Sequence, residues 1–125
     1  MPQQHALVTG GAGFIGSHLC ESLIEQGWRV TAVDDLSTGS LQNLAALETE
    51  SRFALETASA ADADRLRRAA AGADCVFHLA SVVGVRRVME DTVLTIEKNL
   101  HTMETVLEVC TERRLRLVTA SSSEV

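Results

Sequence analysis

The sequence predicts an α/β domain built on a doubly wound parallel sheet of five strands in the order 3-2-1-4-5. Three observations predict it. Short apolar runs alternate with helical segments, a glycine-rich stretch joins the first run to the first helix, and 46% of the 125 residues are hydrophobic. Such alternation is typical of parallel sheets with helices on both faces, and right-handed crossovers favour this strand order. The length suits a single domain over residues 1–125.

The strands are expected to be short and apolar because both faces of the sheet are covered. They are predicted, in chain order, at residues 6–8, 30–33, 53–55, 75–79 and 115–119. Helices are predicted between them at residues 14–26, 41–47, 61–71 and 93–110. In the first helix Ile15, Leu19 and Leu23 recur every four residues, and Gly27 follows as a stop.

The last predicted helix carries one continuous apolar stripe, which is typical of a helix that packs against a core. Spacings of three and four residues separate its members: Val93, Ile96, Leu100, Met103, Leu107 and Cys110.

Composition argues against several classes of function. The net charge is −6 and basic residues form only short pairs, which does not favour nucleic-acid binding. No apolar stretch approaches the ~18 residues of a membrane span. The first ten residues lack the pattern of a secretory signal, so a cytoplasmic protein is expected. Cys20, Cys75 and Cys110 have no CxxC spacing, and the histidines have no metal-ligand spacing, so we expect reduced core thiols and no metal site.

The stretch TGGAGFIGS, residues 9–17, is the strongest local signal. It contains GxGxxG from Gly11 to Gly16, and Gly10, Gly13 and Gly16 also fit GxxGxxG. A strand is predicted before it and a helix after it. Glycines let backbone N–H groups approach a pyrophosphate, and a helix N-terminus supplies donors and partial positive charge. The pattern predicts dinucleotide binding, and a purely structural turn is the alternative.

Asp34 and Asp35 come directly after the second predicted strand, and Asp34 stands where a carboxylate accepts hydrogen bonds from the ribose hydroxyls of a dinucleotide. They favour NAD over NADP, since a 2′-phosphate would meet like charge and no Arg lies nearby in the sequence. One such contact at ~4 Å and a dielectric constant of ~20 costs about 4 kcal/mol. A solvated pair of aspartates is the alternative.

With TGGAGFIGS, the segments VDDLSTG, VFHLAS and TASSSEV carry a resemblance to a known family. The chain resembles the N-terminal part of the extended short-chain dehydrogenases/reductases, which have a Rossmann-like fold. More narrowly, it is similar to the NAD-dependent nucleotide-sugar epimerases, dehydratases and decarboxylases, with enzymes of UDP-sugars most alike. The similarity runs from Ala6 to Val125, ahead of the sixth strand and the sugar-binding part of a family member.

This resemblance, with the patterns above, assigns the site residues. The expected cofactor-binding residues are Gly10, Gly13, Phe14, Ile15, Gly16, Asp34, Asp35, Leu79, Ala80 and Asn99. Ser122 matches the active-site Ser/Thr that hydrogen-bonds the sugar hydroxyl being oxidised. Glu124 matches an acid that some dehydratases and decarboxylases use. An exposed helical Asn99 and a surface Glu124 are the alternatives, and His78 is expected to be a hydrogen-bonded core histidine.

The chain departs from the family pattern at several points. Ala58-Ser59 stands where the family has Gly-Asp near the adenine, and Thr102-Met103 replaces a Gly-Thr pair. The family's Tyr-xxx-Lys base is absent, and the chain contains no tyrosine. Without that base, the chain alone is predicted to be inactive.

The sequence thus predicts the NAD-binding portion of an enzyme that acts on nucleotide sugars. Two alternatives remain open. One is a binding module that only holds NAD. The other is a structural fragment that binds no cofactor. Leu115 and Leu117 at an uncovered sheet edge predict a homo-oligomer through that edge.

Overall fold

The computed structural model of the chain describes residues 3–81 and 92–120. Its five strands form one parallel sheet in the order β3-β2-β1-β4-β5, which confirms the predicted topology. β1 lies at the centre, where Leu7 pairs with Thr31 of β2 and with Val76 of β4. The strands are β1 His5–Thr9, β2 Arg29–Asp34, β3 Phe53–Thr57, β4 Cys75–His78 and β5 Arg116–Thr119.

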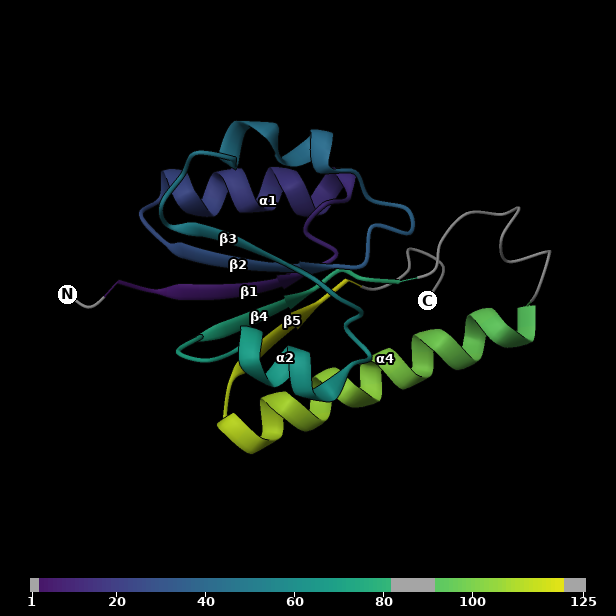
Figure 1. Cartoon of the computed structure of the whole chain (residues 1–125). Coiled ribbons are helices and arrows are strands. Elements are labelled where there is room, and N and C mark those ends of the chain that lie inside the picture. The colour runs from purple at the N-terminus through teal and green to yellow at the C-terminus, as the bar shows by residue number, and fades with distance from the viewer. Residues whose placement is uncertain (1–2, 82–91, 121–125) are drawn as a thin grey trace.

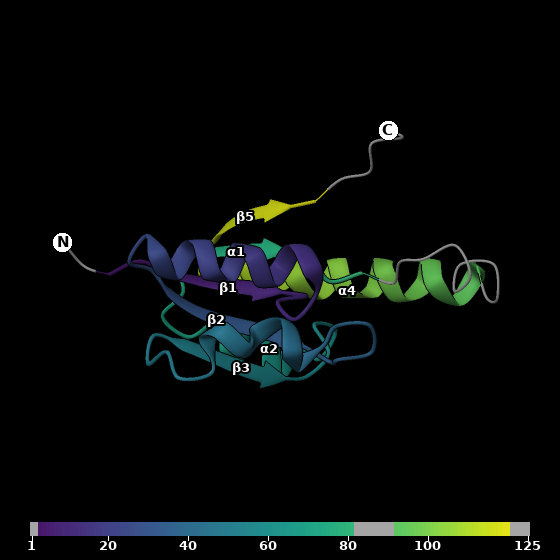
Figure 2. The ribbon, with the colours of Figure 1, turned by 90° about the horizontal axis from the view of Figure 1, so that it is seen from above.

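The helices form a layer on each face of the sheet (Figure 1). One layer holds α1 (Phe14–Glu25) and the 3₁₀ helix η1 (Leu41–Leu47). The other holds α2 (Ala63–Ala69) and α4 (Thr92–Arg113). In Figure 2 the amino-terminal part of α4 extends past the carboxyl ends of the strands. The element types agree with the predictions.

Helix ends follow local chemistry. α2 begins at Ala63, later than predicted, because Asp62 caps it by accepting a hydrogen bond from Arg65 N at 3.3 Å. α1 ends before Gly27, whose φ of 90° is open to glycine at little cost. Trp28 N then donates to Leu23 O at 2.9 Å, which satisfies a carbonyl of the last turn.

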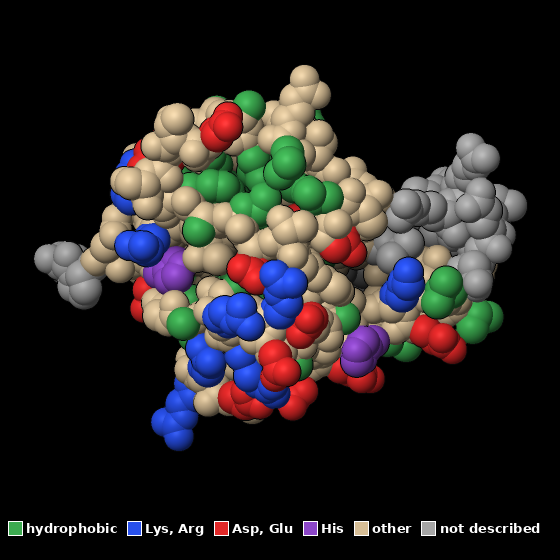
Figure 3. All heavy atoms as spheres, in the orientation of Figure 1, with side chains coloured by type: hydrophobic (Ala, Val, Ile, Leu, Met, Phe, Trp, Pro, Cys, Tyr) green, Lys and Arg blue, Asp and Glu red, His purple; other side chains and the backbone are tan. Residues whose placement is uncertain are grey.

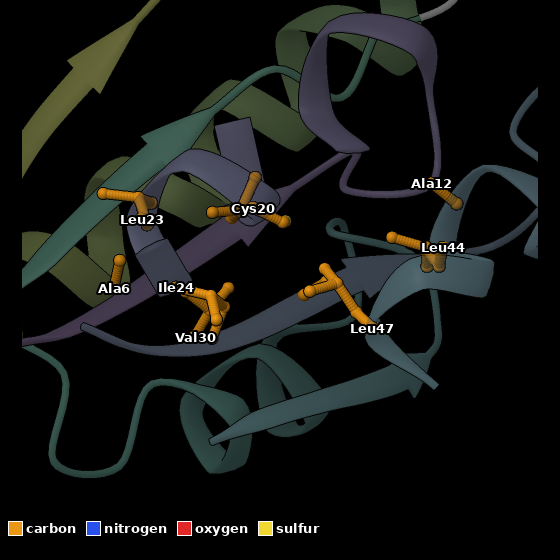
Figure 4. Close-up of a cluster of buried hydrophobic side chains, with 10 residues drawn as sticks. Ala6, Ala12, Cys20, Leu23, Ile24, Val30, Leu44 and Leu47 are labelled. Atoms are coloured by element: carbon orange, nitrogen blue, oxygen red, sulfur yellow. The ribbon is translucent and has the colours of Figure 1, made fainter. Parts of the chain in front are cut away.

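Two apolar cores lie on the two faces of the sheet. The α1 and η1 side packs ten buried residues, eight of which Figure 4 labels: Ala6, Ala12, Cys20, Leu23, Ile24, Val30, Leu44 and Leu47. On the α2 and α4 side, Leu66, Val106 and Val109 pack on Leu7 and Val76 and are almost inaccessible to solvent. All three cysteines are buried and free, as predicted.

Ion pairs join the two helices of the second layer. Arg67 of α2 contacts Glu108 at 3.3 Å and Glu112 at 3.0 Å, both on α4. Figure 3 shows acidic and basic side chains gathered over α2 and the neighbouring part of α4. Both glutamates are exposed and Arg67 is only partly buried, so each pair adds little to stability.

The apolar stripe predicted for the last helix does not pack against the sheet. Val93, Ile96, Leu100 and Leu107 are 47 to 66% exposed, whereas α4 buries Thr95, Thr105, Val106, Val109 and Cys110. The buried face is turned roughly a third of a turn from the stripe. Figure 3 shows hydrophobic side chains at the surface of the amino-terminal end of α4. Only Cys110 and the half-buried Met103 of the predicted stripe are withdrawn from solvent.

β5 forms an edge of the described sheet, as the predicted order requires. Leu115 and Leu117, however, are not uncovered, because both pack in part against the core on the α2 and α4 side. The apolar side chain exposed on this strand is Val118, at 48%.

Candidate functional site

A cavity of about 820 Å³ opens at the carboxyl ends of the parallel strands. Its walls come from the glycine loop between β1 and α1, the loops after β2, β3 and β4, and the amino-terminal half of α4. Every residue predicted to bind the cofactor lies in its lining: Gly10, Gly13, Phe14, Ile15, Gly16, Asp34, Asp35, Leu79, Ala80 and Asn99. Ligands of open α/β sheets bind at this edge, and the volume suits a small molecule.

The glycine loop is tightly packed where side chains would block it. At Gly10, with φ of 73°, a Cβ would come within 2.9 Å of Ala80 N. At Gly16 a Cβ would collide with the Gly10 carbonyl oxygen. Glycine is therefore needed both for the turn and for the close approach of α1 to the strand.

Gly13 is less tightly enclosed than Gly10 and Gly16, because a Cβ added to it would meet only Gly10 O, at 3.3 Å. Gly13 is the N-cap of α1 in extended conformation, and its helix has no side-chain cap. The first turn of α1 therefore has no capping side chain, and its residues Phe14, Ile15 and Gly16 line the cavity. Such a helix end is suited to an anionic group.

Asp34 is 8% exposed and holds the glycine loop. Its Oδ2 accepts a hydrogen bond from Ala12 N at 2.9 Å, and its Oδ1 accepts one from Leu36 N at 2.7 Å. Each carboxylate oxygen has a further lone pair, so Asp34 can still accept a ribose hydroxyl. Asp34 therefore also holds the backbone of the glycine loop in place, a role that the sequence did not indicate.

Asp35 is exposed at the rim, and its carboxylate accepts a hydrogen bond from Ser37 N at 2.9 Å. Partial burial opposes ionisation of Asp35. The hydrogen bonds from Ser37 and the charge of Lys98 outweigh it, so the pKa of Asp35 lies below its usual value. Lys98 on α4 lines the same cavity. The described lining residues include one lysine, Lys98, a positive charge at the cavity that the sequence did not indicate.

A buried hydroxyl joins the glycine loop to the loop after β4. Thr9 Oγ1 accepts hydrogen bonds from Leu79 N at 3.0 Å and Ala80 N at 3.2 Å, and it lies 2.6 Å from His78 Nδ1. With both lone pairs used, the Thr9 hydroxyl must donate to His78 Nδ1, so the proton of neutral His78 is on Nε2. Burial lowers the pKa of His78, which favours this neutral form. The prediction of a hydrogen-bonded core histidine is confirmed.

Three of the four residues that depart from the family pattern, Ala58, Ser59 and Thr102, line the cavity. Ala58 is buried, and Ser59 Oγ accepts a hydrogen bond from Ala61 N at 3.1 Å in the turn that precedes α2. Thr102 Oγ1 donates to Lys98 O on its own helix at 2.8 Å. Ser59 therefore forms part of the wall on the expected adenine side, and Thr102 forms part of the wall that α4 contributes.

Further lining residues were not singled out from the sequence: Ser37, Thr38, Gly39, Ser81 and His101. The segment VDDLSTG was the signal that could have indicated the first three, since it begins in the last two residues of β2 and continues into the loop after it. Ser122 and Glu124 lie outside the described residues. Across residues 3–81 and 92–120, no three His, Cys, Asp or Glu side chains form a group that could hold a metal, and no helix is long and apolar enough to cross a membrane.

The comparisons with known proteins agree with this geometry. A model of the NAD dependent epimerase/dehydratase family matches residues 6–125. The chain belongs to this family. It is 34% identical over 123 residues to a UDP-N-acetyl-alpha-D-glucosaminuronate decarboxylase from Bacillus cytotoxicus, covering 98% of this chain. It is 38% identical over 127 residues to a dTDP-glucose 4,6-dehydratase from Streptomyces griseus, covering 97% of this chain.

Among solved structures, the chain is similar to the UDP-glucose 4-epimerase of Thermus thermophilus in complex with NAD. The TM-score is 0.82 at 34% identity, over 95% of this chain and 38% of that one. The chain also spans 38% of the length of each of the two curated relatives. The NAD dependent epimerase/dehydratase family thus contains epimerases, dehydratases and decarboxylases similar to this chain over about two fifths of their length.

Proposed function

We propose that this chain binds NAD in the cavity at the carboxyl edge of the sheet and forms the cofactor-binding part of an enzyme that acts on a nucleotide sugar. One observation carries the proposal. The glycine loop, the uncapped end of α1 and the Asp34 carboxylate line the same cavity. Membership of an NAD dependent family supports the choice of cofactor. The printed activities of the relatives support the class of substrate.

The residues present fit such a dinucleotide. The backbone N–H groups of Phe14 and Ile15 at the start of α1 would hold the pyrophosphate, and Gly13 would line it. Asp34 would accept a hydrogen bond from the adenosine ribose. Leu79 and Ala80, held by the Thr9 hydroxyl, would line the nicotinamide side with their backbone. Asn99 would complete the wall on the side of α4.

When bound, NAD supplies a hydride acceptor for a sugar carbon. We assign Ser122, which follows β5 in the sequence, to the hydrogen bond with the sugar hydroxyl. The tyrosine that acts as the base in the family which the chain resembles has no counterpart among the 125 residues. The chain alone is therefore expected to bind NAD without turning over a nucleotide sugar. The kind of reaction is not assigned, because the relatives include a decarboxylase and a dehydratase.

The most direct test of the proposal is a calorimetric titration with NAD that compares the wild-type chain with Gly13→Ala. The new methyl group would stand beside the pyrophosphate, so NAD affinity should fall roughly tenfold or more. Within the protein it makes one tight contact, with Gly10 O at 3.3 Å, which a small shift of the loop relieves. Asp34→Ala is less informative, because it also releases Ala12 N.

Gly27→Ala is the matched control. It strains a residue with φ of 90° and adds a methyl with no neighbour within 4 Å, away from the cavity. It should lower the free energy of unfolding and leave NAD affinity unchanged. No saturable binding to the wild-type chain at millimolar NAD would overturn the proposal. It would favour a structural domain that holds no cofactor.

A further inference from the structure

We propose that Asn43 is a positioning residue for the phosphate-binding glycine loop, acting through the backbone of Ala12. The inference rests on the proposed function, which makes the glycine loop a pyrophosphate site. Asn43 lies in η1, between β2 and β3, and does not itself line the cavity. Its effect on a ligand would therefore be indirect.

The backbone of Ala12 is held on both of its polar groups. Asn43 Nδ2 donates to Ala12 O at 2.8 Å, and Ser40 N donates to the same oxygen at 3.0 Å. On the other side, Ala12 N donates to Asp34 Oδ2 at 2.9 Å. Ala12 itself is fully buried, so these partners replace water.

Two consecutive peptide planes are fixed by these contacts. A peptide unit is planar, so the direction of Ala12 O also sets the direction of Gly13 N–H. Ala12 N–H likewise sets the plane shared with Gly11. Asn43 and Ser40 thus orient the peptide that enters α1, and Asp34 orients the one before it. Gly13 N donates to Gly10 O at 3.1 Å, which closes the loop on itself.

Asn43 is in turn held by the segment that carries it. Ser40 caps η1 by accepting from Gln42 N at 3.2 Å, and Asn43 N donates to Ser40 O at 3.0 Å. Leu44 and Leu47 are buried in the same core as Ala12, and Figure 4 shows Leu44 next to Ala12. The η1 segment therefore contacts the glycine loop through apolar packing as well as through hydrogen bonds.

An amide suits this place because it can donate to a carbonyl, whereas a carboxylate cannot. Asn43→Asp would place an oxygen opposite Ala12 O and should disturb the loop more than Asn43→Ala does. Asn43 is exposed as a residue, so water can replace the amide in the alanine variant. The alanine variant should lose roughly threefold in NAD affinity and the aspartate variant roughly tenfold.

The test compares ligands with and without a pyrophosphate. NAD, ADP-ribose and adenosine are titrated into the wild-type chain, Asn43→Ala, Asn43→Asp and the neighbouring control Gln42→Ala. If Asn43 positions the loop, both Asn43 variants should bind NAD and ADP-ribose with lower affinity than the wild type does, while their affinity for adenosine stays the same. Gln42→Ala should bind all three ligands as the wild type does. Equal weakening for all three ligands, or no weakening, would overturn the inference.

Amide hydrogen exchange without ligand separates this inference from the proposed function. Exchange at Gly13 N–H should be faster in Asn43→Ala than in Gln42→Ala, because its peptide plane has lost a restraint. If the wild-type chain binds no NAD while exchange at Gly13 responds, the proposed function fails and the mechanical role of Asn43 stands. If exchange at Gly13 is unchanged in Asn43→Ala, the inference fails whatever the chain binds.

Discussion

Replacing Thr9 by valine removes one hydroxyl that serves three partners. Thr9 is fully buried, and its hydroxyl lies at hydrogen-bond distance from His78 Nδ1, Leu79 N and Ala80 N. Leu79 N keeps a second acceptor, the Thr9 carbonyl oxygen at 3.1 Å. Valine therefore leaves His78 Nδ1 and Ala80 N without the hydroxyl. At ~1–3 kcal/mol for each group, and with some return from the added methyl, the free energy of unfolding should fall by about 2–4 kcal/mol.

Urea unfolding of the wild type, Thr9→Val and Thr9→Ser measures this loss. Serine keeps the hydroxyl and removes a methyl, so it should be the more stable of the two variants. The urea midpoint of Thr9→Val should drop at an unchanged slope, because the surface exposed on unfolding is the same. A valine variant within ~0.5 kcal/mol of the wild type would refute the assignment of three bonds to this hydroxyl.

The pH dependence of the free energy of unfolding tests the same Thr9–His78 hydrogen bond in a second way. Burial lowers the pKa of His78 in the folded chain, so the unfolded chain, with a pKa near ~6.5, binds the proton more readily. The stability that neutral His78 contributes is complete above pH ~6.5 and is lost as the pH falls from there toward the folded pKa. His5, whose pKa burial also lowers, acts in the same direction. His78→Gln should partly flatten the fall in the free energy of unfolding below pH ~6.5. If this fall is the same in the variant as in the wild type, a buried neutral His78 does not contribute to it.

Four further outcomes are expected. Leu66→Ala, at a side chain 1% exposed, should lower the free energy of unfolding by about 2–4 kcal/mol in urea titrations. Burial, with a smaller effect of Glu21, raises the pKa of Cys20 to about 12, so at pH 8 this thiol should react with iodoacetamide only in urea; rapid labelling of the folded chain would contradict its burial. NAD should bind more tightly than NADP in calorimetry, and Asp35→Asn should narrow the difference; equal wild-type affinities would count against the aspartates as discriminators. If the chain self-associates through β5, Val118→Lys should shift sedimentation toward the monomer; a shift with Leu100→Lys alone would move the contact to α4.

The parts of this structure that local chemistry decides could be predicted from the sequence. The glycine spacing, the strand before it and the aspartates at the end of β2 indicated which residues line the cavity, because a turn that needs a positive φ or a close approach accepts little but glycine. The strand order followed from the handedness of crossovers, which does not depend on side chains.

Contacts between distant segments could not be predicted in this way. Asn43 reaches Ala12 only because η1 folds back against the glycine loop, and Lys98 meets the cavity only because α4 extends past the sheet. The apolar stripe of α4 shows the same limit. Periodicity identifies an apolar face, but the position of the neighbouring elements decides which face is buried. Here Val106 and Val109 meet α2 and the sheet while Leu100 and Leu107 do not.

The cavity is the place where the two helical layers meet at one surface. Phe14 and Ile15 line it from the α1 side, and Asn99 and Thr102 line it from α4, while the two apolar cores stay separate on opposite faces of the sheet. Because the cores are separate, we expect the helices of each layer to open locally as a unit of their own. A dinucleotide that touches both would join their opening into one cooperative event. Bound ligand should then slow amide exchange in segments of both layers together, including parts of α1 and α4 that it never contacts.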